Sequence, residues 1–135
     1  MHTLLAALTL FPNQFKNVVF LTVGEIDIEQ FHGQEKVARM QVEIDTRLER
    51  FSNWCERRGL ATATYRAYGT ETVDLLDRLS GEVLETFPNT IFFASKLLFA
   101  NENFFTRLLH NSTPLALQRK LHSRGVTMVI LPMKV

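Results

Sequence analysis

Small and polar residues that could bind a ligand follow three apolar stretches of the chain, "KNVVFLTV", "ATATYRAY" and "TIFFASKLLFA". If these stretches are parallel strands, the residues after them lie beyond the carboxyl ends of the strands, where open α/β sheets bind ligands. The candidate ligand-binding residues are Gly24, Glu25, Asp27, Gly69, Thr70 and Asn101.

The residues after the first stretch do not form a known phosphate-binding loop. The sequence contains no G-x-G-x-x-G and no Walker A pattern, and Gly24 and Gly33 are too far apart to belong to either. The plain alternative is that Gly24 ends a strand while Glu25 and Asp27 are solvated. A nucleotide site built on glycine amides is therefore not supported, and we expect no cofactor.

Residues typical of metal binding and covalent catalysis are scattered. His32 and Glu35 have H-x-x-E spacing, but a zinc site needs three or four convergent ligands, so we expect no metal. Cys55 lies on the apolar stripe of a predicted helix near its C-terminus, which favours a core position over a nucleophile. No serine lies in a G-x-S-x-G pattern. We expect no catalytic residues and no enzymatic activity.

Composition narrows the class of protein. The 135 residues carry 15 Lys plus Arg against 14 Asp plus Glu, so no net charge favours nucleic acid, and the basic residues Arg119, Lys120 and Arg124 are expected on a solvated helix face. A single cysteine fits a reducing compartment. No apolar run reaches the roughly 20 residues of a membrane-spanning helix, and the N-terminus lacks the features of a signal peptide. We expect a soluble, cytosolic chain that does not insert into a membrane.

Periodicity predicts alternating strands and helices. The apolar segment 16–23 is typical of a strand buried on both faces and closed by Gly24. Apolar residues every three or four positions predict a helix over 34–58, stopped by Gly59. Gly69 ends a second, more exposed strand, and Thr70 caps a helix that runs to about residue 86. The remaining predicted elements are a strand from 91–93 onward, a short helical stretch, a helix with Thr113 as cap and Pro114 as its first residue, stopped by Gly125, and a last strand at 128–131.

This order predicts one α/β domain over residues 1–135. Crossovers between successive strands give a mostly parallel sheet of four to five strands with helices on both faces, a Rossmann-like three-layer sandwich. A short helix at about 3–11 precedes the first strand. Because this helix is not a crossover, its apolar residues need other cover, and we expect a homodimer with this helix at or beside the interface.

Several segments carry a family resemblance. The chain resembles the C-terminal soluble region of bacterial permeases of the amino acid–polyamine–organocation transporter superfamily. The segments that carry this resemblance are "FKNVVFLTVGEID", "YGTETVDLLDRL" and "FPNTIFFASKLLFANENFFTRLLHNSTPLALQRKLHSRGVTMVILPMKV". The resemblance extends from Phe15 to the end of the chain, and its most specific parts are "FKNVVF", "LLHN", "ALQRKLH" and "VILPMKV".

The resemblance implies a fold and a role. It implies a fold similar to universal stress proteins, although the glycine-rich loop with which some of those proteins bind ATP has no counterpart at Gly125. It also implies a non-enzymatic regulatory or assembly domain of an amino acid permease, held at the cytoplasmic face of the inner membrane, with the parent membrane domain as partner. The alternative is a sensor that binds a small ligand or nucleotide in the crevice at the strand ends; a third, weaker reading is a free-standing flavodoxin-like enzyme.

Overall fold

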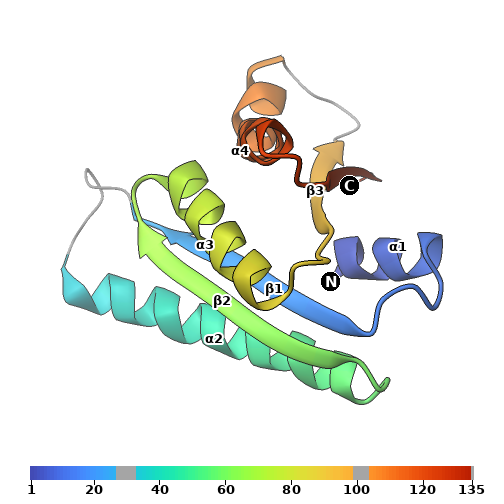
Figure 1. The fold of residues 1–135 in the computed structure, drawn as a ribbon. Coiled ribbons are helices and arrows are strands. Elements are labelled where there is room, and N and C mark those ends of the chain that lie inside the picture. The colour runs from blue at the N-terminus through green and yellow to red at the C-terminus, as the bar shows by residue number, and fades with distance from the viewer. Residues whose placement is uncertain (27–32, 99–103, 135) are drawn as a thin grey trace. The chain divides into compact units, whose positions relative to one another are not determined.

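The computed structural model describes residues 1–26, 33–98 and 104–134, which form an α/β structure of two compact units (Figure 1). The β1–β2 unit is Phe15–Thr86, and the β3–β4 unit combines Met1–Gln14 with Phe87–Val135. In chain order the elements are α1 (His2–Leu10), β1 (Asn17–Glu25), α2 (Gln34–Glu56), β2 (Ala61–Gly69), α3 (Thr72–Thr86), β3 (Phe92–Leu98), α4 (Phe104–Ser123) and β4 (Met128–Lys134).

The β1–β2 unit is a strand–helix–strand crossover followed by a second helix. β1 and β2 pair in parallel, with a register from Asn17 opposite Ala61 to Glu25 opposite Gly69. Figure 1 shows the two strands between α2 and α3. The unit is therefore layered as predicted, with a helix on each face of a parallel sheet.

Side chains of the two strands alternate between these helices. Even-numbered residues face α2: the rings of Phe20 and Phe51 lie 5.7 Å apart, and Arg66 forms an ion pair of 3.0 Å with Asp45. Odd-numbered residues face α3, as shown by the hydroxyl contact of 3.4 Å between Tyr65 and Thr86. This alternation follows from the period of two along a strand.

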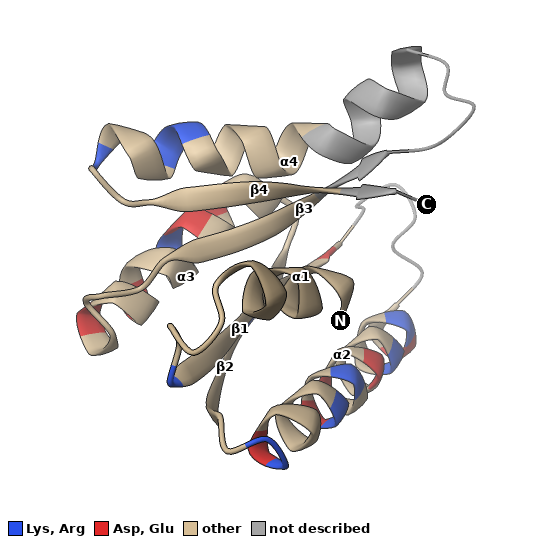
Figure 2. Ribbon diagram, turned by 90° about the vertical axis from the view of Figure 1, so that its right-hand side faces the viewer, with Lys and Arg blue, Asp and Glu red and all other residues tan. Residues whose placement is uncertain are grey.

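The β3–β4 unit has the same crossover with a different second helix. β3 and β4 pair in parallel from Phe92 opposite Met128, and α4 connects them. α1 and α4 both pack on this sheet, and Figure 2 shows them on its two sides. At the end of α1 the ring of Phe11 lies 5.8 Å from that of Phe93.

Both crossover helices end at the glycines that the sequence indicated. Gly59 has φ +74° and Gly125 has φ +73°. After α2 the amides of Gly59 and Leu60 donate to the carbonyls of Glu56 and Cys55, and the amides after α4 repeat this arrangement. These are Schellman motifs, in which a glycine adopts the left-handed conformation that side chains disfavour.

The core is small and divided between the two units. Among the described residues, the side chains that are fully covered are Val83 and Cys55 in the β1–β2 unit and Leu121 in the β3–β4 unit, together with Ser80. Ser80 donates to the Leu76 carbonyl at 2.7 Å, which satisfies its buried hydroxyl.

The sheet prediction is confirmed in part, for the parallel pairing of the strands. We predicted one sheet of four to five strands, but the described residues form two sheets of two strands each, β1–β2 and β3–β4. The first strand was also expected to be buried on both faces and closed by Gly24. Instead β1 continues through Gly24 to Glu25, its apolar side chains are half-buried, and among the described residues it pairs with β2.

Two helix starts also differ from prediction. α3 begins at Thr72 rather than directly after Thr70, so Thr70 is not its cap. α4 is one helix from Phe104 to Ser123 and contains Pro114, where the sequence had suggested a new helix. A proline inside a helix removes one backbone donor, and α4 accommodates that loss without ending there.

Candidate functional site

The carboxyl ends of β1 and β2 bring three of the candidate residues together. Glu25 is opposite Gly69 in the register, and Gly24 is opposite Tyr68. The amide of Ile26 donates to the Gly69 carbonyl at 2.9 Å, which extends the pairing past the end of β1. Gly24, Glu25 and Gly69 therefore lie side by side at the carboxyl ends of the two strands, and their role in ligand binding stays a prediction.

Gly24 makes room for an aromatic ring. A Cβ at this position would lie 2.5 Å from Cδ1 of Tyr68 and 3.1 Å from the side chain of Ile44 on α2. The Tyr68 ring thus packs over the backbone of β1 between the strand and α2. Since this space is filled by the chain itself, Gly24 has a packing role that the sequence did not reveal.

Gly69 has a similar role on the opposite face. A Cβ there would lie 2.8 Å from Cδ1 of Leu75, on the first turns of α3. Neither Gly24 nor Gly69 has a positive φ, unlike Gly33, Gly59 and Gly125. The two strand-end glycines therefore permit close side-chain packing and do not form a left-handed phosphate-binding turn.

The other candidates are either exposed or outside the described residues. Glu25 and Thr70 are exposed. Asp27 and Asn101 lie outside the described residues, so their predicted roles stay predictions. Asn101 also follows β3, in the other unit from the remaining candidates.

Two hydroxyls near the end of β2 were missed by sequence reasoning. Among the described residues, Oη of Tyr68 and Oγ1 of Thr72 are buried without a hydrogen-bond partner. Burial raises the pKa of Tyr68, and the nearby carboxylate of Asp45 adds to this while Arg66 opposes it. The feature that could have indicated Tyr68 is its position opposite Gly24 on the paired strand, and this position is known only from the register.

A charged surface covers the outer side of α2. Figure 2 shows acidic and basic residues alternating along this helix. Glu35 pairs with Arg39 at 2.6 Å, and Glu43 pairs with Arg47 at 3.0 Å, both with the four-residue spacing that suits a helix. The residues of these pairs are well exposed, so each pair adds little to stability.

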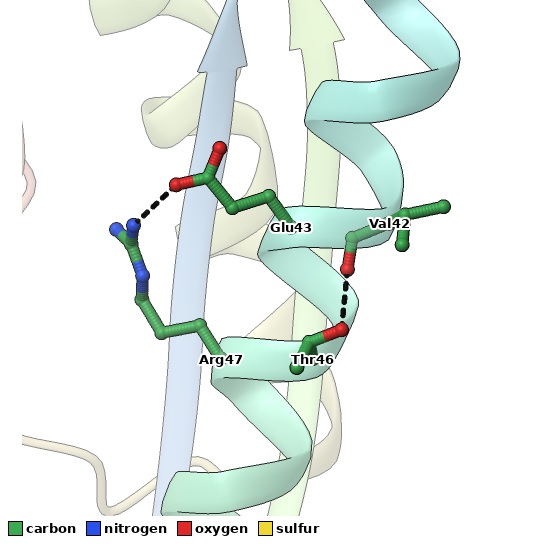
Figure 3. Close-up of polar contacts among 4 residues, drawn as sticks. All are labelled: Val42, Glu43, Thr46 and Arg47. Carbon is green, nitrogen blue, oxygen red and sulfur yellow. Dashed lines mark hydrogen bonds and ion pairs between the residues drawn. The ribbon is translucent and has the colours of Figure 1, made fainter.

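A shallow hollow of about 420 Å³ lies on this surface, lined by Glu43, Thr46, Arg47 and Arg50. Figure 3 shows that Glu43 and Arg47 are paired with each other and that the Thr46 hydroxyl donates to the Val42 carbonyl, at 2.8 Å. Ligand pockets are usually enclosed and largely apolar. This hollow is open, and Glu43, Thr46 and Arg47 are engaged in contacts within α2, so it is a poor candidate for a ligand site.

Cys55 is in the core, as predicted. Its side chain is fully buried on α2, and burial raises the pKa of the thiol, with Arg58 opposing and Glu56 adding to the shift. Arg58 itself stacks over the Trp54 ring, 3.7 Å from the ring centroid. Such a thiol is a weak nucleophile because the thiolate is disfavoured.

The described residues contain neither a metal-binding cluster nor a membrane-spanning helix. Within 1–26, 33–98 and 104–134, no three His, Cys, Asp or Glu residues gather closely enough to hold a metal ion. No helix in these ranges combines the length and apolar character that crossing a bilayer requires. Comparisons with protein-family models, with curated proteins and with solved structures gave no match.

Proposed function

We propose that the chain is a non-enzymatic regulatory or assembly domain of an amino acid permease, located at the cytoplasmic face of the inner membrane. The observation that carries the proposal is the resemblance of residues 15–135 to the soluble C-terminal region of such permeases, above all in "FKNVVF", "ALQRKLH" and "VILPMKV". These segments contribute to β1, α4 and β4, so they belong to the framework of both units. The domain acts by packing against the membrane domain of its parent.

The native gene tests this directly. We expect the reading frame upstream of Met1 to encode about a dozen apolar segments, each long enough to span a bilayer. Deleting residues 15–135 from that permease should then alter uptake of its amino acid or lower the amount of assembled transporter in the membrane. An in-frame stop directly before Met1, or unchanged uptake and abundance after the deletion, would contradict the proposal.

The proposed assembly includes a homodimer contact through α1. Residues 1–15 contain no Asp, Glu, Lys or Arg, and Figure 2 shows α1 free of charge colours. Ala7 is buried, whereas Leu5 is 40% exposed and Leu10 is 60% exposed. The Thr9 hydroxyl donates to the Leu5 carbonyl at 2.8 Å, so its proton is already engaged within the helix. An apolar helix of this kind favours contact with a second copy about a two-fold axis.

Replacement of the exposed leucines tests the dimer. Leu5→Gln/Leu10→Gln should reduce self-association by about tenfold or more, measured by light scattering across protein concentrations. Leu115→Gln, at a residue of α4 that is 42% exposed, is the matched control. A wild-type chain that is monomeric at all concentrations, or a dimer unaffected by the α1 variant, would rule out this contact.

We further propose that the strands come together in one mostly parallel sheet of four to five strands, similar to that of universal stress proteins. Support comes from the free edge of β1. The hydrogen bond from Ile26 to Gly69 and the register show that even-numbered residues of β1 direct their backbone groups to β2. The backbone groups of Val19, Leu21 and Val23 therefore point away from β2. A strand this apolar is typical of a sheet interior. Slow amide exchange at these three residues would support a further neighbouring strand, and exchange as fast as in an exposed loop would contradict it.

The alternative of a small-ligand sensor has one observation in its favour, the unpartnered hydroxyls of Tyr68 and Thr72 at the end of β2. Gly24 and Gly69 provide no phosphate-binding turn, so we expect ATP and cyclic di-adenosine monophosphate to bind weakly or not at all. Calorimetric titration should give a Kd above about 10 μM for both. Tighter binding that is lost in Tyr68→Phe would favour the sensor over the assembly domain.

A further inference from the structure

The outer edge of β4, on the side away from β3, can be identified from one hydrogen bond and the register. The Phe92 amide donates to the Thr127 carbonyl at 3.1 Å, and Phe92 is opposite Met128. In a parallel pair, successive residues direct their backbone groups to alternate sides of the strand. The residues whose backbone groups point to the outer edge are therefore Met128, Ile130, Pro132 and Lys134.

The first position on this edge is occupied by side chains of α4. Nε2 of Gln118 donates to the Met128 carbonyl at 3.0 Å. Nε2 of His122 lies 3.3 Å from the same oxygen and donates to it in the tautomer protonated at Nε2. Gln118 and His122 are one helical turn apart, so a single side of α4 covers this carbonyl.

The third position, Pro132, lacks a donor altogether. Pro132 is exposed and stands opposite Lys96 in the register. Its ring nitrogen, which would point to the outer edge, carries no hydrogen. Ile130 and Lys134 are unblocked, but Pro132 separates them, so no two successive outward residues offer both of their backbone groups to a ladder.

We propose that β4 is the terminal strand of its sheet and that its outer edge is protected against addition of another strand, including β4 of a second copy. Natural sheets need such protection, because an exposed row of backbone donors and acceptors is a template for aggregation. Here two independent features provide it, the side-chain contacts from the crossover helix and the proline. Contacts between copies are thereby directed to other surfaces.

A variant that restores the free backbone donors and acceptors at the outer edge of β4 tests the proposal. Gln118→Ala/His122→Ala/Pro132→Val uncovers the Met128 carbonyl and returns a backbone donor at position 132. We expect this variant to form species larger than those of the unchanged chain, with association about tenfold tighter or more, in sedimentation velocity. Amides of Met128 and Ile130 should become protected from hydrogen exchange in those species. Gln41→Ala/Pro12→Val makes similar changes at exposed residues elsewhere and should leave association unchanged.

Two results would overturn the proposal. One is a folded triple variant that associates no more than the unchanged chain, with circular dichroism as the check on folding. The other is protection of the Met128 and Ile130 amides when the unchanged chain associates. If the triple variant does not fold, the exposed single change Pro132→Val is measured in the same way: tighter association through β4 supports the proposal, and unchanged association contradicts it.

Discussion

The two units of this protein build the same parallel crossover with different contacts between helix and strand. In the β1–β2 unit, α2 contacts β2 through side chains of both elements, as in the ion pair of Asp45 with Arg66. In the β3–β4 unit, α4 instead donates from Gln118 to the backbone of Met128. The first contact joins side chains of helix and strand, whereas the second engages the backbone at the strand edge. A crossover helix can therefore determine where a sheet ends.

The helices on the other face of each sheet, α3 and α1, differ in their charge. α3 carries acidic and basic residues, including Arg78 and Glu82, which are 3.7 Å apart. α1 carries no charged residue. A charged helix is suited to lasting exposure to water, while an uncharged one exposes apolar area that a partner can cover. The comparison places the expected assembly surface on the β3–β4 unit.

The largest effect should come from the core of the β3–β4 unit. Leu121 is fully buried, so Leu121→Ala should lower the free energy of unfolding by about 2–5 kcal/mol, through lost burial and the cavity left behind. Urea unfolding followed by circular dichroism measures the change. Leu115→Ala on the same helix is the control and should cost well under half as much, since Leu115 is 42% exposed. Equal losses would mean that α4 is not packed as described.

In the β1–β2 unit the sharpest test is at a glycine. Gly24→Ala places a Cβ against the ring of Tyr68 and should lower the free energy of unfolding by about 1–3 kcal/mol, because the ring and α2 must shift. Gly81→Ala is the matched control in α3, where nothing lies within 4 Å of the added atom. That change should raise stability by about 0.5–1 kcal/mol, because alanine favours a helix. The same unfolding assay would contradict the packing role of Gly24 if both variants gained stability.

Alkaline pH should weaken the β1–β2 unit through Cys55 and Tyr68. Burial raises the pKa of both groups above their ordinary values of 9.0 and 10.0. As pH rises through these values, the unfolded chain releases protons that the folded chain retains, so the free energy of unfolding falls. Urea unfolding over this range should show the fall in the unchanged chain and a smaller one in Cys55→Ala/Tyr68→Phe. Identical pH dependence in the two chains would count against buried, neutral groups.

The smallest expected effect is loss of the ion pair between α2 and β2. Asp45 and Arg66 are both about half exposed, so their coupling in a double-mutant cycle of Asp45→Asn and Arg66→Gln should be under about 1 kcal/mol. It should also decrease with added salt. A larger coupling that resists salt would mean that this contact, rather than apolar packing, holds α2 on the sheet.

Periodicity in the sequence was sufficient to predict the alternation of strands and helices and the glycine stops after α2 and α4. It did not predict which strands pair, because an apolar stretch such as β1 shows that it needs neighbours without specifying them. Pro114 was interpreted as a helix start since proline is common there, yet α4 continues through it.

The candidate site was predictable only in part, for a related reason. The strand ends of β1 and β2 do meet, but the glycines there accommodate Tyr68 and Leu75, and such packing depends on register. The contact of Gln118 with the Met128 carbonyl was equally hidden, because any polar residue on a helix looks solvated in a sequence. Patterns identify elements, whereas side-chain contacts between elements appear only in the structure.

The left-handed glycine after α2 has a consequence for strand parity. Gly59 fixes the last turn of the helix, and β2 begins two residues later at Ala61. If the helix extended by one residue, β2 would enter the sheet one position out of step, and its two rows of side chains would exchange faces. Arg66 would then point away from Asp45, and Tyr65 would point toward α2. The glycine at position 59 thus determines which row of β2 side chains faces α2 and which faces α3.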